Sequence, residues 1–274
     1  MTGILNSSGH AQSTRPQFEV ASIKQDKACD GRRGGGPPPA PGRLNMECTT
    51  LRSLIKNAYG SFADGVALNP RDLDIAGGPA WIASESYDVA AKAEDGASIA
   101  QMAGPMLQAL LEDRFKLKVH RETREAAVYL LTVAKEGPQL ERTKEGSCVS
   151  LDLNHLPPAP APGESEPVFC GNQSMSSQGS NIILSARGIT MELLANGALA
   201  RVACRPILDK TGLVGRFDIQ LEFTPDRAGA RAGEPDASGP SIFEALRQLG
   251  LRLDPGKGAV EVLVVNDVER PSEN

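Results

Sequence analysis

Two stretches of ten residues decide the fold: residues 108–117 read QALLEDRFKL and residues 244–253 read EALRQLGLRL. They align without a gap, so Leu110 matches Leu246 and Leu117 matches Leu253. In both, apolar residues first recur at the three-to-four-residue spacing of a helix and then alternate with charged residues, as in a half-buried strand. Each stretch therefore predicts a helix that passes directly into a strand.

Three further pairs of segments match between the first and the second half of the sequence, in the same order along the chain. Each set contains a threonine placed to cap a helix, a strand-like run with aspartate in second position, and a hydrophobic strand. The pairs are 50–54 with 190–194, 87–93 with 217–223, and 128–133 with 260–265. An internal duplication explains this order. The alternative is two unrelated α+β pieces that share common amphipathic patterns.

Local sequence signals define the predicted elements of the second copy more closely. Ser241 and Glu244 form an S-x-x-E capping box, so a helix should begin there, and Gly250 marks its end. Residues 254–258 (DPGKG) predict a turn that returns the chain as a β-hairpin packed beside the helix. In the first copy, Gly104-Pro105 predicts a helix that restarts or kinks.

Strands in runs with helices on one face indicate an α+β fold of two tandem related units, each with helices packed on a mainly antiparallel sheet. Between them lies a Pro-, Ser- and Gly-rich segment without periodicity, which reads as a linker or long loop. The expected boundaries are a disordered tail or remnant of an export signal (1–17), a first unit (18–140), the linker (141–180) and a second unit (181–274).

Composition excludes two broad classes. The chain has 274 residues, with 29 Lys and Arg against 34 Asp and Glu, for a net charge of −5. Proteins that bind nucleic acids usually have a basic surface and aromatic residues that stack on bases. The net negative charge and the aromatic content of 4% therefore argue against a nucleic-acid partner. No run of about 18 apolar residues is present, so no membrane span is expected.

The first residues and the cysteines bear on the compartment. The start, MTGILNSSGHAQ, lacks a basic region and an apolar stretch, although small residues are spaced as at a signal-peptidase site. Cys29 with Cys48, and Cys148 with Cys170, each bracket a Pro/Gly-rich loop, which predicts two disulfides and a periplasmic or extracellular location. The alternative is a cytoplasmic protein with idle thiols. Cys204 is left over and is expected to be buried.

The chain resembles a known family on a set of short motifs spread over most of its length. The motifs are Phe18–Lys24 (FEVASIK), Gly78–Trp81 (GPAW), Met106–Leu117 (MLQALLEDRFKL), Asp209–Asp218 (DKTGLVGRFD) and Val265–Pro271 (VNDVERP). They are similar to the Solibacter-associated, acidobacterial family of uncharacterised soil-bacterial proteins of the DUF3738 type. The resemblance implies export and, because similar domains follow membrane peptidase modules of the β-lactam-sensor type, a sensory or binding role. It implies no catalytic residues.

A search for catalytic motifs finds no nucleophile elbow, zinc-binding helix, P-loop or dinucleotide fingerprint. Three dispersed histidines, His10, His120 and His155, do not indicate a metal site, and no cofactor is expected. Asp88 and Asp218 are weak catalytic candidates, because they would pair if the two units pack about a twofold axis. The alternative is that each closes a turn in its own unit.

Trp81, the single tryptophan, is a weak candidate for stacking on a ligand; the alternative is that it caps the core. The sequence therefore favours a non-catalytic binding or sensory module whose partner is an unknown small molecule or an envelope protein. A hydrolase or carbohydrate-active enzyme that uses acids at the interface of the units is the alternative. A third hypothesis is a structural envelope protein that works through an exposed sheet edge.

Overall fold

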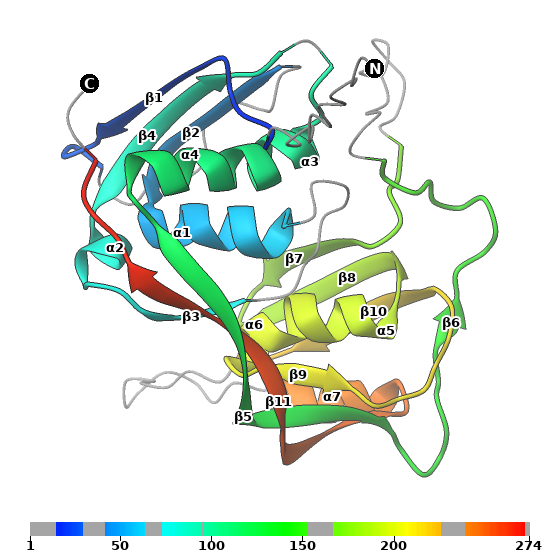
Figure 1. Cartoon of the computed structure of the whole chain (residues 1–274). Helices are drawn as coiled ribbons and strands as arrows, with labels where there is room; N and C mark the ends of the chain where they lie inside the picture. Colours follow the sequence, from blue (N-terminus) through cyan, green and yellow to red (C-terminus); the bar gives the residue numbers. More distant parts are fainter. Residues whose placement is uncertain are drawn as a thin grey trace, which may run out of the picture.

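The computed structural model describes residues 15–29, 42–63, 73–94, 96–152, 167–225 and 239–271. Within these ranges the chain forms three sheets with short helices packed against them (Figure 1). The pairing is mainly antiparallel. The predicted α+β class is confirmed.

The first sheet has the strand order β1-β4-β2 and is antiparallel throughout. Its strands are β1 (Val20–Gln25), β2 (Arg43–Thr50) and β4 (Ser86–Lys92). Figure 1 shows helices α1 and α4 lying over one face of it. The helical elements of this half are α1 (Leu51–Lys56), the π-helical turn η1 (Asn57–Ser61), α2 (Trp81–Ser84), α3 (Ile99–Gln101), the π-helical turn η2 (Met102–Met106) and α4 (Leu107–Arg114).

The second sheet has the strand order β6-β10-β8-β7 and is also antiparallel. Its strands are β6 (Glu141–Arg142), β7 (Asn172–Gln178), β8 (Asn181–Ile189) and β10 (Phe217–Phe223). The helical elements of this half are α5 (Met191–Leu194), the π-helical turn η3 (Ala195–Leu199), α6 (Ala200–Ala203) and α7 (Ile242–Gln248).

The third sheet, of order β3-β11-β5-β9, joins the two halves. Its strands are β3 (Asp74–Gly77), β5 (Lys118–Val133), β9 (Ile207–Asp209) and β11 (Leu251–Asp267). The long strands β5 and β11 pair antiparallel along nearly their whole length. The short strand of each half runs parallel to the long strand of the other half, β3 on β11 and β9 on β5. Both halves of the sequence thus contribute strands to this sheet, and its strand pairs connect them.

The elements of the two halves follow one common order of strand, helix, short strand, strand, helix and long strand. In the first half these are β2, α1, β3, β4, α4 and β5, and in the second they are β8, α5, β9, β10, α7 and β11. Both predicted threonine caps form: Thr50 accepts a bond from the Ser53 N–H and Thr190 from the Leu193 N–H, each at 3.2 Å. This common order is the one that an internal duplication predicts.

The predicted hairpin turn at residues 254–258 is wrong. These residues are the middle of β11 and pair with Leu130–Ala126 of β5. Gly256 and Gly258 have no side chain, and this lets leucines of β5 and β9 lie over them: Leu130 against Gly256 and Leu208 against Gly258. A turn-forming composition is therefore held extended by a partner strand from the other half.

The hydrophobic core has two clusters, and each draws on both long strands. The first lies between the first sheet and its helices and includes Leu263 and Val265 from the end of β11. The second includes Leu131 from the end of β5, together with Leu251 and Leu253 from the start of β11. Neither core is complete without a strand that belongs to the other half in sequence.

Three local expectations met different outcomes. The capping box of Ser241 and Glu244 is present at the start of α7. At Gly104-Pro105 the helix continues through the π-helical turn η2, with Gly104 at non-helical angles, so the predicted kink is found. The expected linker 141–180 is in part regular structure, because it contains β6 and β7.

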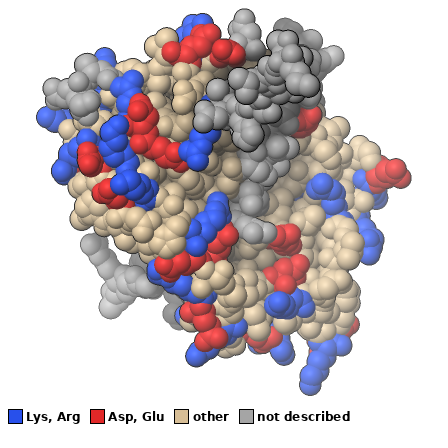
Figure 2. All heavy atoms as spheres, in the orientation of Figure 1, with Lys and Arg blue, Asp and Glu red and all other residues tan. Residues whose placement is uncertain are grey.

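The surface carries charges of both signs. Figure 2 shows lysines and arginines interleaved with acids over this face. On the long ladder of the third sheet, Lys118 pairs with Asp267 at 3.1 Å and Lys257 with Glu125 at 3.5 Å. Within the described ranges, no helix is both long enough and apolar enough to cross a membrane.

Candidate functional site

The two aspartates proposed as a catalytic pair lie in separate sheets, at equivalent β-bulges. Asp88 of β4 accepts a hydrogen bond at 2.9 Å from the backbone N–H of Cys48, and Asp218 of β10 accepts one at 2.9 Å from the N–H of Gly188. Both donors have positive φ, 50° at Cys48 and 61° at Gly188. The two carboxylates therefore form their bonds in different sheets, Asp88 in the first and Asp218 in the second. Each closes a bulge in its own half.

The second of these carboxylates is held ionised by its contacts. Partial burial acts to raise the pKa of Asp218, but the Gly188 N–H and the Thr143 hydroxyl, the latter at 2.7 Å, outweigh it and lower the pKa below its ordinary value. A general acid needs the opposite shift, toward neutral pH.

Trp81 has one face of its indole covered by a cation. The guanidinium carbon of Arg270 lies 4.9 Å from the ring centroid, and Arg270 also donates to Glu85 at 2.7 Å. Tyr87 donates to the same carboxylate at 3.1 Å, and burial followed by this bond raises the pKa of Tyr87 to about 12. Trp81 also packs against the first core. The cluster fastens the segment after β11 onto the first half, which leaves that face of the indole unavailable for stacking.

Of the histidines, only His120 lies among the described residues; His10 and His155 lie outside them. His120 is exposed, and its two ring nitrogens are each 2.8 Å from an acceptor-bearing side chain, Asn266 and Glu122. Cys204 was expected to be buried, and this is wrong: it is an exposed thiol at the left-handed C-cap of α6. Cys204 ends α6 in the left-handed conformation, with a φ of 47°, and its sulfur contacts only the Arg201 carbonyl of its own turn at 3.6 Å among the hydrogen bonds of the described residues.

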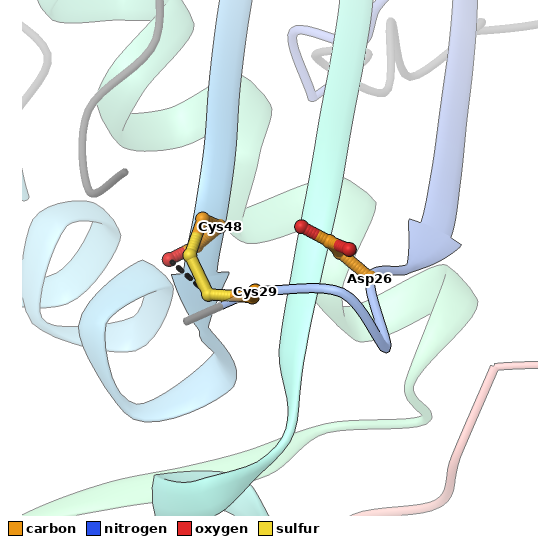
Figure 3. A group of neighbouring side chains, drawn as sticks. All are labelled: Asp26, Cys29 and Cys48. Carbon is orange, nitrogen blue, oxygen red and sulfur yellow. Dashed lines mark hydrogen bonds between the residues drawn. A yellow bond between two sulfur atoms is a disulfide. The ribbon is translucent and has the colours of Figure 1, made fainter. Parts of the chain in front are cut away.

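Both predicted disulfides are present, Cys29–Cys48 with Cα atoms 5.4 Å apart and Cys148–Cys170 with Cα atoms 5.1 Å apart. Figure 3 shows the first beside the Asp26 carboxylate, at the end of β2. The potential ligand atoms of these three residues lie within 4.8 Å of one another. Both sulfurs are in the disulfide, so neither is a free thiolate for a metal. Asp26 instead accepts a bond at 2.9 Å from the Ala28 N–H.

A groove runs beside the N-terminal segment. It comprises two adjoining hollows of about 320 and 550 Å³, and their linings share Gln17, Phe18, Glu19 and Met106. The rest of the lining mixes acids, arginines and small apolar residues, and Lys92 reaches Glu19 at 2.6 Å. This mixed lining does not indicate one class of ligand.

A second hollow lies at the outer strand of the second sheet. It has a volume of about 420 Å³ and is lined by Gln173 and Met175 of β7 with Arg201 and Val202 of α6. The side chain of Gln173 is fixed there, because its Oε1 accepts a bond at 3.0 Å from the Ala198 N–H. The lining contains one cation and no carboxylate.

Exposed apolar side chains lie on β7 and on the two segments joined by the Val149–Phe169 bridge. Six large hydrophobic residues of the described chain are exposed, and four of them lie on β7 or on the paired segments that lead into it. These four are Val149, Leu151, Val168 and Met175. Together with the outer edge of β7 they are named here the β7 margin. Sequence reasoning missed this surface; the available signal was a charge-free run, NQSMSSQ, between Gly171 and Gly179.

The fold and these surfaces define a disulfide-bonded α+β protein whose candidate catalytic residues are engaged in structural contacts. Residues 52–268 match the family model described as "Protein of unknown function (DUF3738)". The match covers most of the chain, and the protein belongs to this family. Comparison with curated proteins and with solved structures gave no match.

Proposed function

We propose that the protein is an extracytoplasmic, non-catalytic interaction module that binds a partner protein through the β7 margin. The observation that carries the proposal is that exposed Val149, Leu151, Val168 and Met175 lie on β7 and on the bridged segments beside the Cys148–Cys170 disulfide. Large exposed apolar residues scattered singly need no explanation, whereas a gathered set is typical of a binding surface.

The state of the candidate catalytic residues supports binding over catalysis. Asp88 and Asp218 each accept a backbone bond at their own bulge, and Trp81 is covered by Arg270. A two-carboxylate hydrolase requires its acids within about 10 Å of each other across the substrate. The hydrolase alternative has no geometric support of this kind.

The two disulfides support a location outside the cytoplasm, since such bonds persist in oxidising compartments. The second also supports the site itself. Cys148 and Cys170 flank the parallel bridge between Val149 and Phe169, so the bond holds the apolar residues of the margin in place beside β7.

Photocrosslinking in the native host tests this function. A photoreactive amino acid at Leu151 should give a discrete adduct with another protein in the envelope fraction. The same residue at Val214, which is 83% exposed and lies away from the margin in sequence, is the matched control. Loss of the Leu151 adduct in a Val149→Ser, Val168→Ser background would support the proposal. Equal adducts at both positions, or none at Leu151, would overturn it.

A further inference from the structure

We infer that the partner docks as an extended peptide segment that adds a strand to the outer edge of β7, with an apolar and an acidic side chain in the hollow beside α6. This inference rests on the proposed function and specifies the chemistry of the partner.

The backbone N–H and C=O groups on the outer side of β7 are arranged for strand addition. Strand β7 is the last strand of its sheet, paired with β8 on one side and with no strand of the described chain on the other. The two-residue turn Gly179–Ser180 makes Gln178 and Asn181 a hydrogen-bonded pair. By alternation, the backbone groups of Gln173, Met175 and Ser177 then point away from β8, toward an incoming strand.

The edge of β7 also lacks the protection that the other edges have. Soluble proteins guard exposed sheet edges with charges, prolines or very short strands. The five other edge strands of the described sheets each carry a charged residue: Lys24 in β1, Arg43 and Glu47 in β2, Asp74 in β3, Glu141 and Arg142 in β6, and Asp209 in β9. Strand β7 has seven residues, no charge and no proline. An unguarded edge of this length is what strand addition requires.

The hollow sets the side-chain preference. An added strand presents alternate side chains to one face, so those on the face of Gln173 and Met175 enter the hollow. Met175 and Val202 offer apolar contact, and Arg201 offers the single charge. The matching peptide therefore has a medium apolar residue and a carboxylate two residues apart. A guanidinium favours a carboxylate partner for its paired hydrogen bonds.

The test uses a displayed library of linear twelve-residue peptides and the full disulfide-bonded chain. Selected peptides should show an apolar residue and Asp or Glu at alternate positions. Ser177→Pro removes one outward N–H, and it should weaken the selected peptide at least about tenfold, the effect of losing one or two net hydrogen bonds. Ser177→Ala, which keeps that N–H, should bind as the parent does, and thermal unfolding of both variants checks their folding.

Charge reversal tests the hollow separately. Arg201→Glu should weaken acidic peptides about tenfold, as expected for a lost charge-assisted bond. Arg247→Glu is the matched control, because Arg247 is also exposed in the last turn of its helix, α7. Equal loss in both variants would overturn the role of the hollow.

Other outcomes separate this inference from the proposed function. If Leu151 gives its adduct in cells but the library yields no peptide sensitive to Ser177→Pro, strand addition is overturned and the interaction surface stands. If sedimentation shows a dimer that Ser177→Pro dissociates, the occupant is a second copy of the chain and the peptide assignment is overturned. If neither adduct nor peptide is found, both proposals fail.

Discussion

The two halves of this protein share one order of helices and strands but differ in the strands that flank their sheets. In the first half, β4 lies in the middle of its sheet, with β1 along one side and β2 on the other. In the second half, the equivalent β10 has only the two-residue β6 on one side, while β8 gains an extra outer strand, β7. The shared elements form the two cores, and the differences lie at sheet edges, one of which is the binding surface proposed above. Changes to shared features should therefore alter stability, and changes to the unshared β7 margin should alter binding.

The largest expected effect tests whether the halves are separable. Leu246 is fully buried in the second core, so Leu246→Ala should lower the free energy of unfolding by about 2–5 kcal/mol. Because β5 and β11 contribute to both cores, the first half should lose stability equally. The fluorescence of Trp81, which packs on the first core, gives one urea midpoint and far-ultraviolet circular dichroism gives another. Both should shift together; an unchanged Trp81 midpoint would mean that the halves unfold independently.

The disulfides come next. Their sequence separations are 19 and 22 residues, so replacing either pair by serines should cost about 3 kcal/mol in the chain-entropy model. Urea unfolding of Cys29→Ser, Cys48→Ser against Cys148→Ser, Cys170→Ser measures the two costs. Thiol titration of the unreduced native chain should detect Cys204 alone. A cost near zero for one pair would show that this bond does not restrain its half.

A smaller effect distinguishes the two bulges. Cys48 and Gly188 hold the same positive-φ position, but a Cβ on Gly188 would meet Cys148 Sγ and lie 3.1 Å from Cys170 Cβ. Gly188→Ala should therefore destabilise by about 1–3 kcal/mol, from backbone strain and crowding. Cys48→Ala, made with Cys29→Ser, is the control and should cost no more than loss of its disulfide. A neutral Gly188→Ala would show that the second bulge can relax.

The smallest effect is a pH dependence. The pKa of Asp218 is lowered in the folded state, so its stabilising contribution is present above the unfolded value of about 4 and is lost as the pH falls through the folded value. Asp218→Asn should therefore reduce the difference in unfolding free energy between pH 6 and pH 3. Urea unfolding at the two pH values measures this difference. An identical difference in the parent and in Asp218→Asn would remove the electrostatic role of this bulge.

The sequence predicts the features that depend on neighbours along the chain. Thr50, Thr190 and the box of Ser241 with Glu244 form local bonds that any folded context preserves, and they are confirmed. The cysteine pairs bracket loops that a disulfide of ordinary geometry can close, and both bonds form. The duplication stays a prediction, which the common order of elements and the paired bulges support.

What the sequence does not predict depends on distant partners. Residues 254–258 have the composition of a turn, and only pairing with β5 keeps them extended. Strand β7 has no hydrophobic alternation, because nearly all of its side chains are at the surface, so it escapes a search for periodicity. Asp88 and Asp218 are equivalent by position, but their partners, the N–H groups of Cys48 and Gly188, are distant in sequence.

The exchange of long strands also sets an order of events during synthesis. Leu263 and Val265 complete the core of the first half, yet they are synthesised after every buried residue of the second core. The first half cannot reach its final packing until β11 has been made. Until β11 is made, the nascent chain remains incompletely folded, and an unfolded chain is the form that passes through a protein-conducting channel.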